Sequence, residues 1–142
     1  MTATRRASGL PTRTVFLDTW AWWEVLHDTP TGRRLAMRYV EAPDTLVYTV
    51  DVALAEVACK LARVGRGEEI GGCLETILNS SEVVPITKEI AVLAGPLLLE
   101  LRGEDSGASG ADAVMLAAAR THQATLVSAD PCYRGQSDVT EK

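Results

Sequence analysis

Four acidic residues are of interest because of where they fall relative to the predicted strands and helices. Asp18 closes an apolar run over residues 14–18 that is typical of a buried strand, and Asp130 lies just after a second such run over 125–128. Ligands of open α/β sheets bind at the carboxyl ends of the strands, so both carboxylates are expected at one rim of a sheet. Asp112 stands in the first turn of a predicted helix that is entered from the same rim, provided that the crossovers are right-handed.

Glu56 is the fourth acid, and it lies inside a predicted helix over 51–64 whose other side chains are mostly apolar. Burying an unpaired carboxylate in such surroundings costs several kcal/mol. Glu56 is therefore expected either to lean out toward Lys60, one helical turn later, or to face a cation.

Together the four acids predict a metal-dependent hydrolase. Clustered carboxylates cannot all ionise without a counter-charge, and oxygen-only ligand sets suit hard cations such as Mg²⁺ or Mn²⁺. Such a site hydrolyses phosphodiester bonds with a metal-activated water and needs no histidine. Taken singly, each acid also has a structural interpretation: Asp18 as a helix cap, Glu56 as half of a surface pair with Lys60, Asp112 as a partner of the helix dipole and Asp130 as a turn residue. The joint pattern favours the metal site, because three of the four acids converge on one rim.

Short apolar runs alternate with segments of helical periodicity along the chain, which predicts an α/β fold. The predicted strands span 14–18, 45–49, 82–85 and 125–128, with a weak edge strand around Val139, and the predicted helices span 20–26, 31–40, 51–64, 68–78, 87–101 and 111–121. Asp51 and Ser109 are expected as helix N-caps, and Gly65 is expected to end the helix over 51–64. This order favours a three-layer sandwich, a mostly parallel sheet flanked by helices. We expect one domain over 14–142 and a flexible tail over 1–13.

The net charge of −5 argues weakly against a general nucleic-acid-binding protein, since phosphate contacts reward basic surfaces. It is compatible with a nuclease whose acidic residues surround bound cations. Arg33, Arg34 and Arg38 are candidates for phosphate contacts, although a solvated helix face is the simpler interpretation of the three.

Three scattered cysteines, Cys59, Cys73 and Cys132, are typical of reduced thiols in a cytoplasmic protein. A zinc site is disfavoured, because the two histidines are not close in sequence to any cysteine. No apolar run approaches the roughly 20 residues that a membrane span requires, so no membrane partner is expected.

Four segments together resemble the acidic motifs of PIN-domain nucleases, in order and in spacing, from Arg13 onward: 15–19 (VFLDT), 54–57 (LAEV), 111–119 (ADAVMLAAA) and 125–130 (TLVSAD). The resemblance is strongest to the small VapC-type toxins of toxin–antitoxin pairs. It implies a Mg²⁺- or Mn²⁺-dependent endoribonuclease that is usually a homodimer and is held inactive by a cognate antitoxin. It also implies that Asp18, Glu56, Asp112 and Asp130 are the catalytic and metal-binding acids, and that Thr19 and Ser128 are the small hydroxyl residues that support them.

Three positions depart from the pattern of this family. Trp20 stands where many members carry a small polar residue, Cys132 stands where a further aspartate is common, and Tyr133 replaces the usual phenylalanine. The position of Cys132 leaves an auxiliary acid in doubt, but none of the three changes removes one of the four acids.

Other functions fit the sequence less well. A haloacid-dehalogenase-like phosphatase requires a second aspartate at position 20, and a response-regulator receiver requires a lysine after a late strand, which Lys60, Lys88 and Lys142 do not supply. A housekeeping RNA-processing nuclease and a catalytically inactive PIN-like binding module both remain as alternatives.

Overall fold

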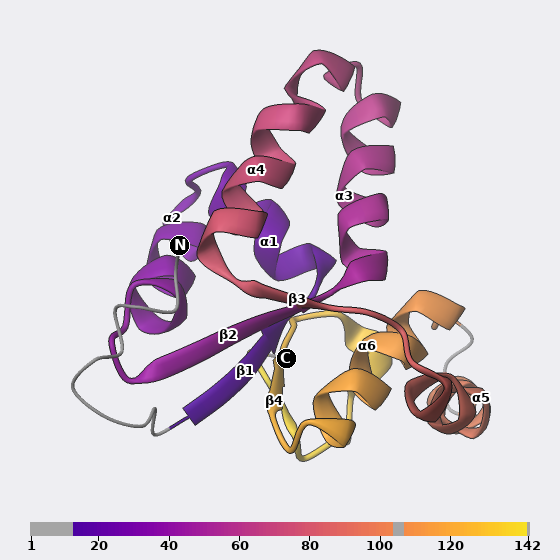
Figure 1. Cartoon of the computed structure of the whole chain (residues 1–142). Helices are drawn as coiled ribbons and strands as arrows, with labels where there is room; N and C mark the ends of the chain where they lie inside the picture. The colour runs from indigo at the N-terminus through magenta and orange to yellow at the C-terminus, as the bar shows by residue number, and fades with distance from the viewer. Residues whose placement is uncertain (1–12, 104–106, 142) are drawn as a thin grey trace.

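The computed structural model describes residues 13–103 and 107–141, and it shows a central sheet between two layers of helices (Figure 1). The sheet has five strands in the order β3-β2-β1-β4-β5, and every neighbouring pair is parallel. The strands are β1 (Arg13–Leu17), β2 (Thr45–Val50), β3 (Glu82–Val84), β4 (Thr125–Val127) and β5 (Val139–Thr140). The predicted α/β sandwich is therefore confirmed, and the expected weak strand around Val139 is its edge.

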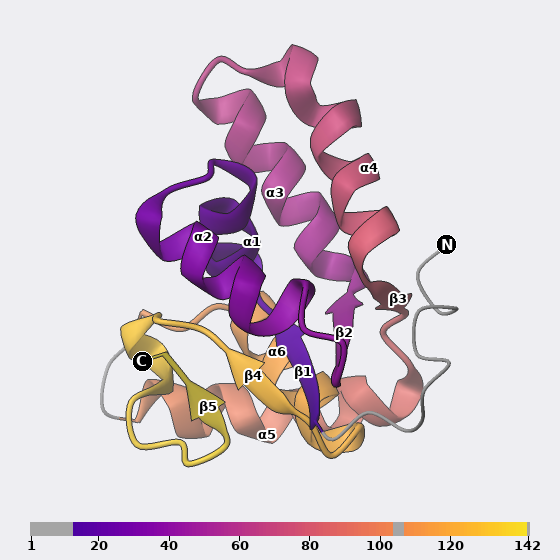
Figure 2. The ribbon, with the colours of Figure 1, turned by 90° about the vertical axis from the view of Figure 1, so that its left-hand side faces the viewer.

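Most of the chain outside the sheet is helical. The helices are α1 (Thr19–Leu26), α2 (Pro30–Leu35), α3 (Asp51–Arg63), α4 (Ile70–Ser80), α5 (Lys88–Arg102) and α6 (Gly110–Thr121), with short turns η2 (Ala36–Val40), η3 (Gly67–Glu69) and η4 (Pro131–Tyr133). Helices α1 to α4 cover one face of the sheet and α5 and α6 cover the other (Figures 1 and 2). In both views α3 and α4 stand side by side and project away from the sheet.

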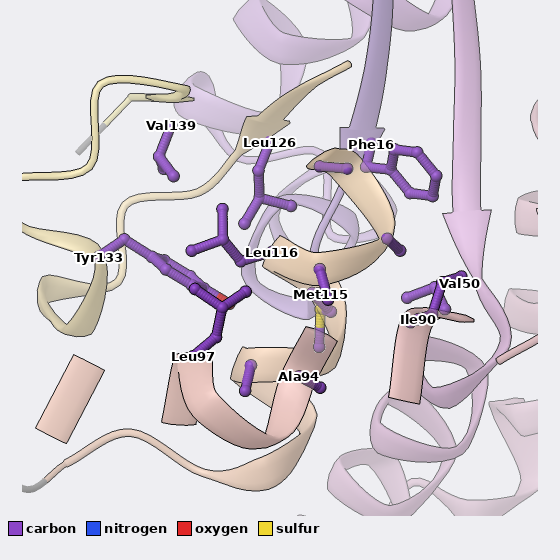
Figure 3. Packing of buried hydrophobic residues seen from close by; sticks show 14 of the residues in the cluster. Phe16, Val50, Ile90, Ala94, Leu97, Met115, Leu116, Leu126, Tyr133 and Val139 are labelled. Carbon is purple, nitrogen blue, oxygen red and sulfur yellow. The ribbon is translucent and has the colours of Figure 1, made fainter. Parts of the chain in front are cut away.

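Alternation along the central strand β1 builds a separate core on each face of the sheet. Val15 and Leu17 point to the side of α1 to α4, where they pack with Trp22. Phe16 points to the opposite side and packs with Leu126 and the inner face of α6 (Figure 3). Because all three β1 side chains are at most 2% exposed, the strand is buried on both faces, as parallel strands usually are.

The helix predicted over 51–64 has a different N-cap and a slightly earlier end in the structure. Val50, not Asp51, precedes α3, and the Asp51 carboxylate instead accepts a hydrogen bond from the backbone N–H of Ile86 at 3.4 Å. Val64, the last residue of the predicted helix, lies just beyond α3 and is 52% exposed, because α3 ends at Arg63 before the chain turns at Gly65. Gly65 has a φ of 81°, in the left-handed region that glycine favours, which confirms it as the end of the helix.

The predicted helix over 31–40 is also different in detail. It is divided between α2 and the π-helical turn η2, and it begins at Pro30 after a Thr29 cap whose hydroxyl accepts from the Gly32 N–H at 2.9 Å. Two of its arginines pair with acids of the chain, since Arg33 lies 3.6 Å from Asp28 and Arg34 lies 2.9 Å from Glu141.

The amino-terminal tail that we expect over 1–13 lies outside the described residues except for Arg13. Arg13 is the first residue of β1, and its N–H donates to the carbonyl of Asp44 at 3.2 Å. In the described part of the chain, no helix combines the length and apolar character that a membrane span requires.

Candidate metal centre

All four of the predicted acids line one pocket of about 470 Å³. Its walls are formed by Asp18, Thr19, Trp20, Ala55, Glu56, Cys59, Lys60, Arg63, Asp112, Met115 and Asp130. Residues at the carboxyl ends of β1 and β4 meet residues of α3 and α6 there, which is where open α/β sheets bind their ligands. The structure thus brings together side chains that lie up to 112 positions apart in the sequence, from Asp18 to Asp130.

Asp18 is both a helix cap and a wall of the pocket. Its Oδ1 accepts from the Ala21 N–H at 2.9 Å at the start of α1, and its side chain is also hydrogen-bonded to Ser128. The residue is only 4% exposed. Burial raises the pKa of Asp18 to about 7, with smaller contributions from the charges of Asp130 and Asp112. This carboxylate lacks a counter-charge that a bound cation would supply.

The side chain of Glu56 is hydrogen-bonded to Thr19, the residue that follows Asp18. The Thr19 hydroxyl donates to Glu56 Oε1 at 2.5 Å, which fixes the glutamate side chain toward the start of α1. Lys60 places its amine 4.3 Å from the centroid of the Trp23 ring. Of the two alternatives for Glu56, orientation toward the pocket is therefore the one that the structure supports.

Asp112 begins α6 in a capping box. Its Oδ2 accepts from the Ser109 N–H at 2.8 Å, while the Ser109 hydroxyl accepts from the Asp112 N–H at 3.2 Å. The predicted Ser109 cap is confirmed. From the other side, the buried hydroxyl of Tyr133 donates to the Asp112 carbonyl at 2.8 Å. The Ser109 N–H therefore holds the carboxylate of Asp112, and the Tyr133 hydroxyl holds its backbone carbonyl.

Asp130 is fixed by the turn that follows β4. Its N–H donates to the Ser128 hydroxyl at 3.0 Å, and its Oδ1 accepts from the Cys132 N–H at 2.9 Å, capping η4. Ser128 thus contacts both Asp18 and Asp130. Each of the two expected hydroxyl residues supports acids of the pocket: Ser128 holds these two, and Thr19 holds Glu56.

Sequence reasoning missed three further contributors. Ligand atoms of Asp112, Asp130 and Cys132 lie within 4.8 Å of one another, which is close enough to share an ion. Lys60 and Arg63, on the same helix as Glu56, add positive charge to the lining of the pocket. The spacing from Glu56 to Lys60 and Arg63, four and seven residues along one helix, was the available signal for the two basic residues.

The donor set fits a divalent cation. Carboxylate oxygens dominate the site, and one of them belongs to a buried acid whose ionisation is disfavoured without a positive charge nearby. Carboxylate oxygens of Asp112 and Asp130 lie close enough to share such an ion, and Asp18 and Glu56 line the same pocket.

The fold and this site define the class of protein. The chain belongs to the PIN domain family, whose family model matches residues 15–134.

Solved structures of toxin–antitoxin proteins share this fold. VapBC2 from Rickettsia felis, bound to a DNA fragment from its promoter, is 17% identical and has a TM-score of 0.70, covering 89% of this chain and 95% of that chain. A toxin–antitoxin complex from Klebsiella pneumoniae is 16% identical with a TM-score of 0.67, covering 88% and 94%. VapC20 from Mycobacterium tuberculosis, a sarcin–ricin-loop-cleaving toxin, is 22% identical with a TM-score of 0.62, covering 78% and 85%. Identities in this range show similarity of fold. No curated protein sequence matches the chain.

Proposed function

We propose that this protein is a Mg²⁺- or Mn²⁺-dependent endoribonuclease and the toxin of a cytoplasmic toxin–antitoxin pair. The observation that carries the proposal is that Asp18, Glu56, Asp112 and Asp130 line one pocket at the carboxyl ends of the central strands. Membership of the PIN domain family supports the same interpretation.

The four carboxylates would hold the cation, which supplies Lewis acidity and an activated water for attack on the phosphodiester. The remaining contacts keep those carboxylates in place before substrate arrives. Thr19 orients Glu56, and Ser128 orients both Asp18 and Asp130. Because hydrogen-bonded ligands lose little freedom on binding, this arrangement favours a preorganised site.

Lys60 and Arg63 are proposed to bind phosphates that flank the cleaved bond. Glu56, Lys60 and Arg63 succeed one another along α3, so the rise of about 1.5 Å per residue places Lys60 about 6 Å and Arg63 about 10 Å along the helix from the glutamate. An acidic centre next to a basic wall suits a polyanion whose reacting phosphate meets a cation and whose neighbouring phosphate meets lysine and arginine. Lys60 and Arg63 thus give the pocket a local positive charge, although the net charge of the chain is −5.

An antitoxin partner is proposed because solved structures with this fold include the R. felis and K. pneumoniae toxin–antitoxin complexes. Homodimerisation also remains a proposal. Trp22 is fully buried and cannot contribute to a dimer surface, whereas Val92 and Leu99 on α5 are 65% and 74% exposed. A housekeeping RNA-processing nuclease is the alternative within the same chemistry.

The test is cleavage of a mixed RNA pool by the purified full chain with Mg²⁺ or Mn²⁺, with EDTA as a chelator control. We expect cleavage that EDTA abolishes and that Asp112→Asn reduces by at least about a hundredfold. Asparagine retains a side-chain oxygen for the Ser109 N–H, so the variant keeps the cap of α6. Asp28→Asn is the matched control, because Asp28 is an exposed acid outside the pocket.

Failure of the well-folded protein both to cleave RNA and to bind Mn²⁺ would move the assignment to a binding module. The toxin role has its own test, because expression of the wild-type chain, but not of Asp112→Asn, should arrest growth of a host cell. Cleavage in vitro without growth arrest would favour the housekeeping nuclease.

A further inference from the structure

Cys132 lies beside the carboxylates of Asp112 and Asp130. A metal site built from hard oxygen ligands does not require a thiol, so the position of this side chain calls for an explanation. Its sulfur, a carboxylate oxygen of Asp112 and one of Asp130 lie within 4.8 Å of one another. The cysteine is 7% exposed, and its thiol lies in hydrogen-bonding reach of both carboxylates. Burial, with smaller contributions from the charges of Asp112 and Asp130, raises the pKa of the thiol.

The backbone around Cys132 fixes this position. Its N–H donates to Asp130 Oδ1 at 2.9 Å within η4, and the next residue, Tyr133, is fully buried and donates its hydroxyl to the Asp112 carbonyl. Cys132 therefore sits on a short turn that is tied to both acids. A side chain held in this way keeps its sulfur near the two carboxylates in whichever state the pocket adopts.

We propose that Cys132 is a ligand of the cation that Asp112 and Asp130 hold, and that its sulfur makes the site prefer Co²⁺, Zn²⁺ or Cd²⁺ over Mg²⁺. This inference rests on the proposed function, since it names the metal preference of the same pocket. When the metal–sulfur bond forms, the S–H bond breaks and its proton passes to solvent, while no electrons are transferred. Soft sulfur donors favour these metals, whereas Mg²⁺ favours oxygen alone.

The distances allow one ion to reach all three side chains. Three donors around one ion, at about 2.3 Å for sulfur and about 2.1 Å for oxygen, lie about 3.0–3.8 Å apart when their angles at the ion are about 90–120°. Atoms that lie within 4.8 Å of one another therefore need to approach by at most about 2 Å, which side-chain rotation can supply. The carboxylates of Asp112 and Asp130 repel one another without a cation, and a divalent ion bound between them makes the interaction favourable.

The experiment is titration of the full reduced chain with Co²⁺, in buffer free of thiol reductants, followed by absorption in the near ultraviolet. A sulfur-to-cobalt charge-transfer band reports a thiolate ligand directly and does not depend on RNA cleavage. We expect a band whose intensity at saturation corresponds to one sulfur ligand per site. The band should be absent in Cys132→Ser and in Cys132→Asp, although the aspartate variant still binds Co²⁺. The Cd²⁺ affinity of Cys132→Ser should fall at least about tenfold, and its Mg²⁺ affinity should change less than about threefold.

The other two cysteines provide matched controls. Cys59 lines the same pocket near Glu56, and Cys73 is partly buried in the core on the face of α1 to α4. In the double variant Cys59→Ser/Cys73→Ser, Cys132 is the single thiol, so persistence of the band assigns it to Cys132 even if Cys132→Ser does not fold. Loss of the band in this double variant would overturn the proposal.

Two other outcomes separate this inference from the proposed function. Calorimetric Co²⁺ binding by the wild-type protein with no sulfur band would overturn the Cys132 ligand and leave the metal-dependent nuclease standing. No binding of Co²⁺, Mn²⁺ or Mg²⁺ by the folded protein would overturn both.

Discussion

The hydroxyl of Thr19 donates to Glu56 Oε1 at 2.5 Å, which joins the first residue of α1 to the middle of α3 across the pocket. Asp18, the preceding residue, caps the same helix from within the pocket. Two consecutive residues therefore do different tasks: Asp18 contributes a carboxylate, and Thr19 aims the carboxylate of another helix. This hydroxyl connects Glu56 to the residue that follows Asp18 at the end of β1.

Thr19→Val should weaken metal binding without unfolding the protein. Valine keeps the shape of threonine but removes the donor, so the Glu56 carboxylate loses the contact that orients it. We expect Mn²⁺ affinity and RNA cleavage to fall about tenfold to a hundredfold, measured by calorimetry and by initial cleavage rates. Thr19→Ser restores the hydroxyl and should recover most of both. Equal losses in the serine and valine variants would show that the methyl group, rather than the hydrogen bond, is what matters.

Asp18→Asn should change how the stability of the metal-free protein depends on pH. In the unfolded chain this carboxyl loses its proton near its usual pKa of 3.8, whereas the folded protein holds it until about pH 7. The folded state therefore binds more protons between these values, so the free energy of unfolding that Asp18 contributes falls as pH rises from about 4 to about 7. Asparagine does not titrate and still caps α1, so this loss is absent in the variant.

The measurement is urea unfolding of both proteins in EDTA at about pH 5.5 and about pH 8. The stability of Asp18→Asn relative to wild type should increase by about 2 kcal/mol between the two conditions. Asp28→Asn, at an exposed acid, serves as the control and should show no such trend. A difference between Asp18→Asn and wild type that is constant with pH would contradict the raised pKa of Asp18.

Lys60→Gln combined with Arg63→Gln should weaken substrate binding and leave the chemical step intact. Both residues line the pocket and would contact phosphates only in the complex with RNA. We expect KM to rise about tenfold with kcat little changed, and the slope of log KM against log salt concentration to decrease by about one for each lost contact. Lys88→Gln is the matched control, because Lys88 begins α5 on the other face of the sheet. A drop in kcat without a change in salt dependence would place the two residues in the chemical step instead.

Much of this architecture could be predicted because the signals are local. The alternation of apolar runs and helical periodicity gave the strand and helix order, and the acids at strand ends follow from where parallel sheets bind ligands. The orientation of Glu56 could not be decided from sequence, because it depends on a contact with Thr19 that lies 37 positions away. Cys132 was seen only as a missing aspartate, since its approach to Asp112 is created by the docking of η4 against α6.

The helix caps also include one that local sequence predicts and one that a distant contact changes. Ser109 follows the sequence rule and caps α6 together with Asp112, whereas the carboxylate of Asp51 accepts from the Ile86 N–H in the segment after β3. Val64, the last residue of the predicted helix over 51–64, is 52% exposed because α3 ends at Arg63, in a part of the helix pair α3 and α4 that projects beyond the sheet (Figure 2).

Gly32→Ala should destabilise the protein and impair the site from a distance. A β-carbon at position 32 would lie 1.8 Å from the carbonyl oxygen of Glu24 and 2.9 Å from the backbone nitrogen of Val25, so α2 would have to move off α1. Because both obstacles are backbone atoms, no side-chain rotation relieves them, and we expect a loss of about 3 kcal/mol in the free energy of unfolding, measured by urea titration of tryptophan fluorescence. Gly71→Ala in α4 meets nothing within 4 Å and should be neutral or stabilising by up to about 1 kcal/mol. Gly32→Ala should also lower the Mn²⁺ affinity, because Asp18 and Thr19 enter the pocket from the start of α1. An unaltered affinity would show that α1 holds its position without α2.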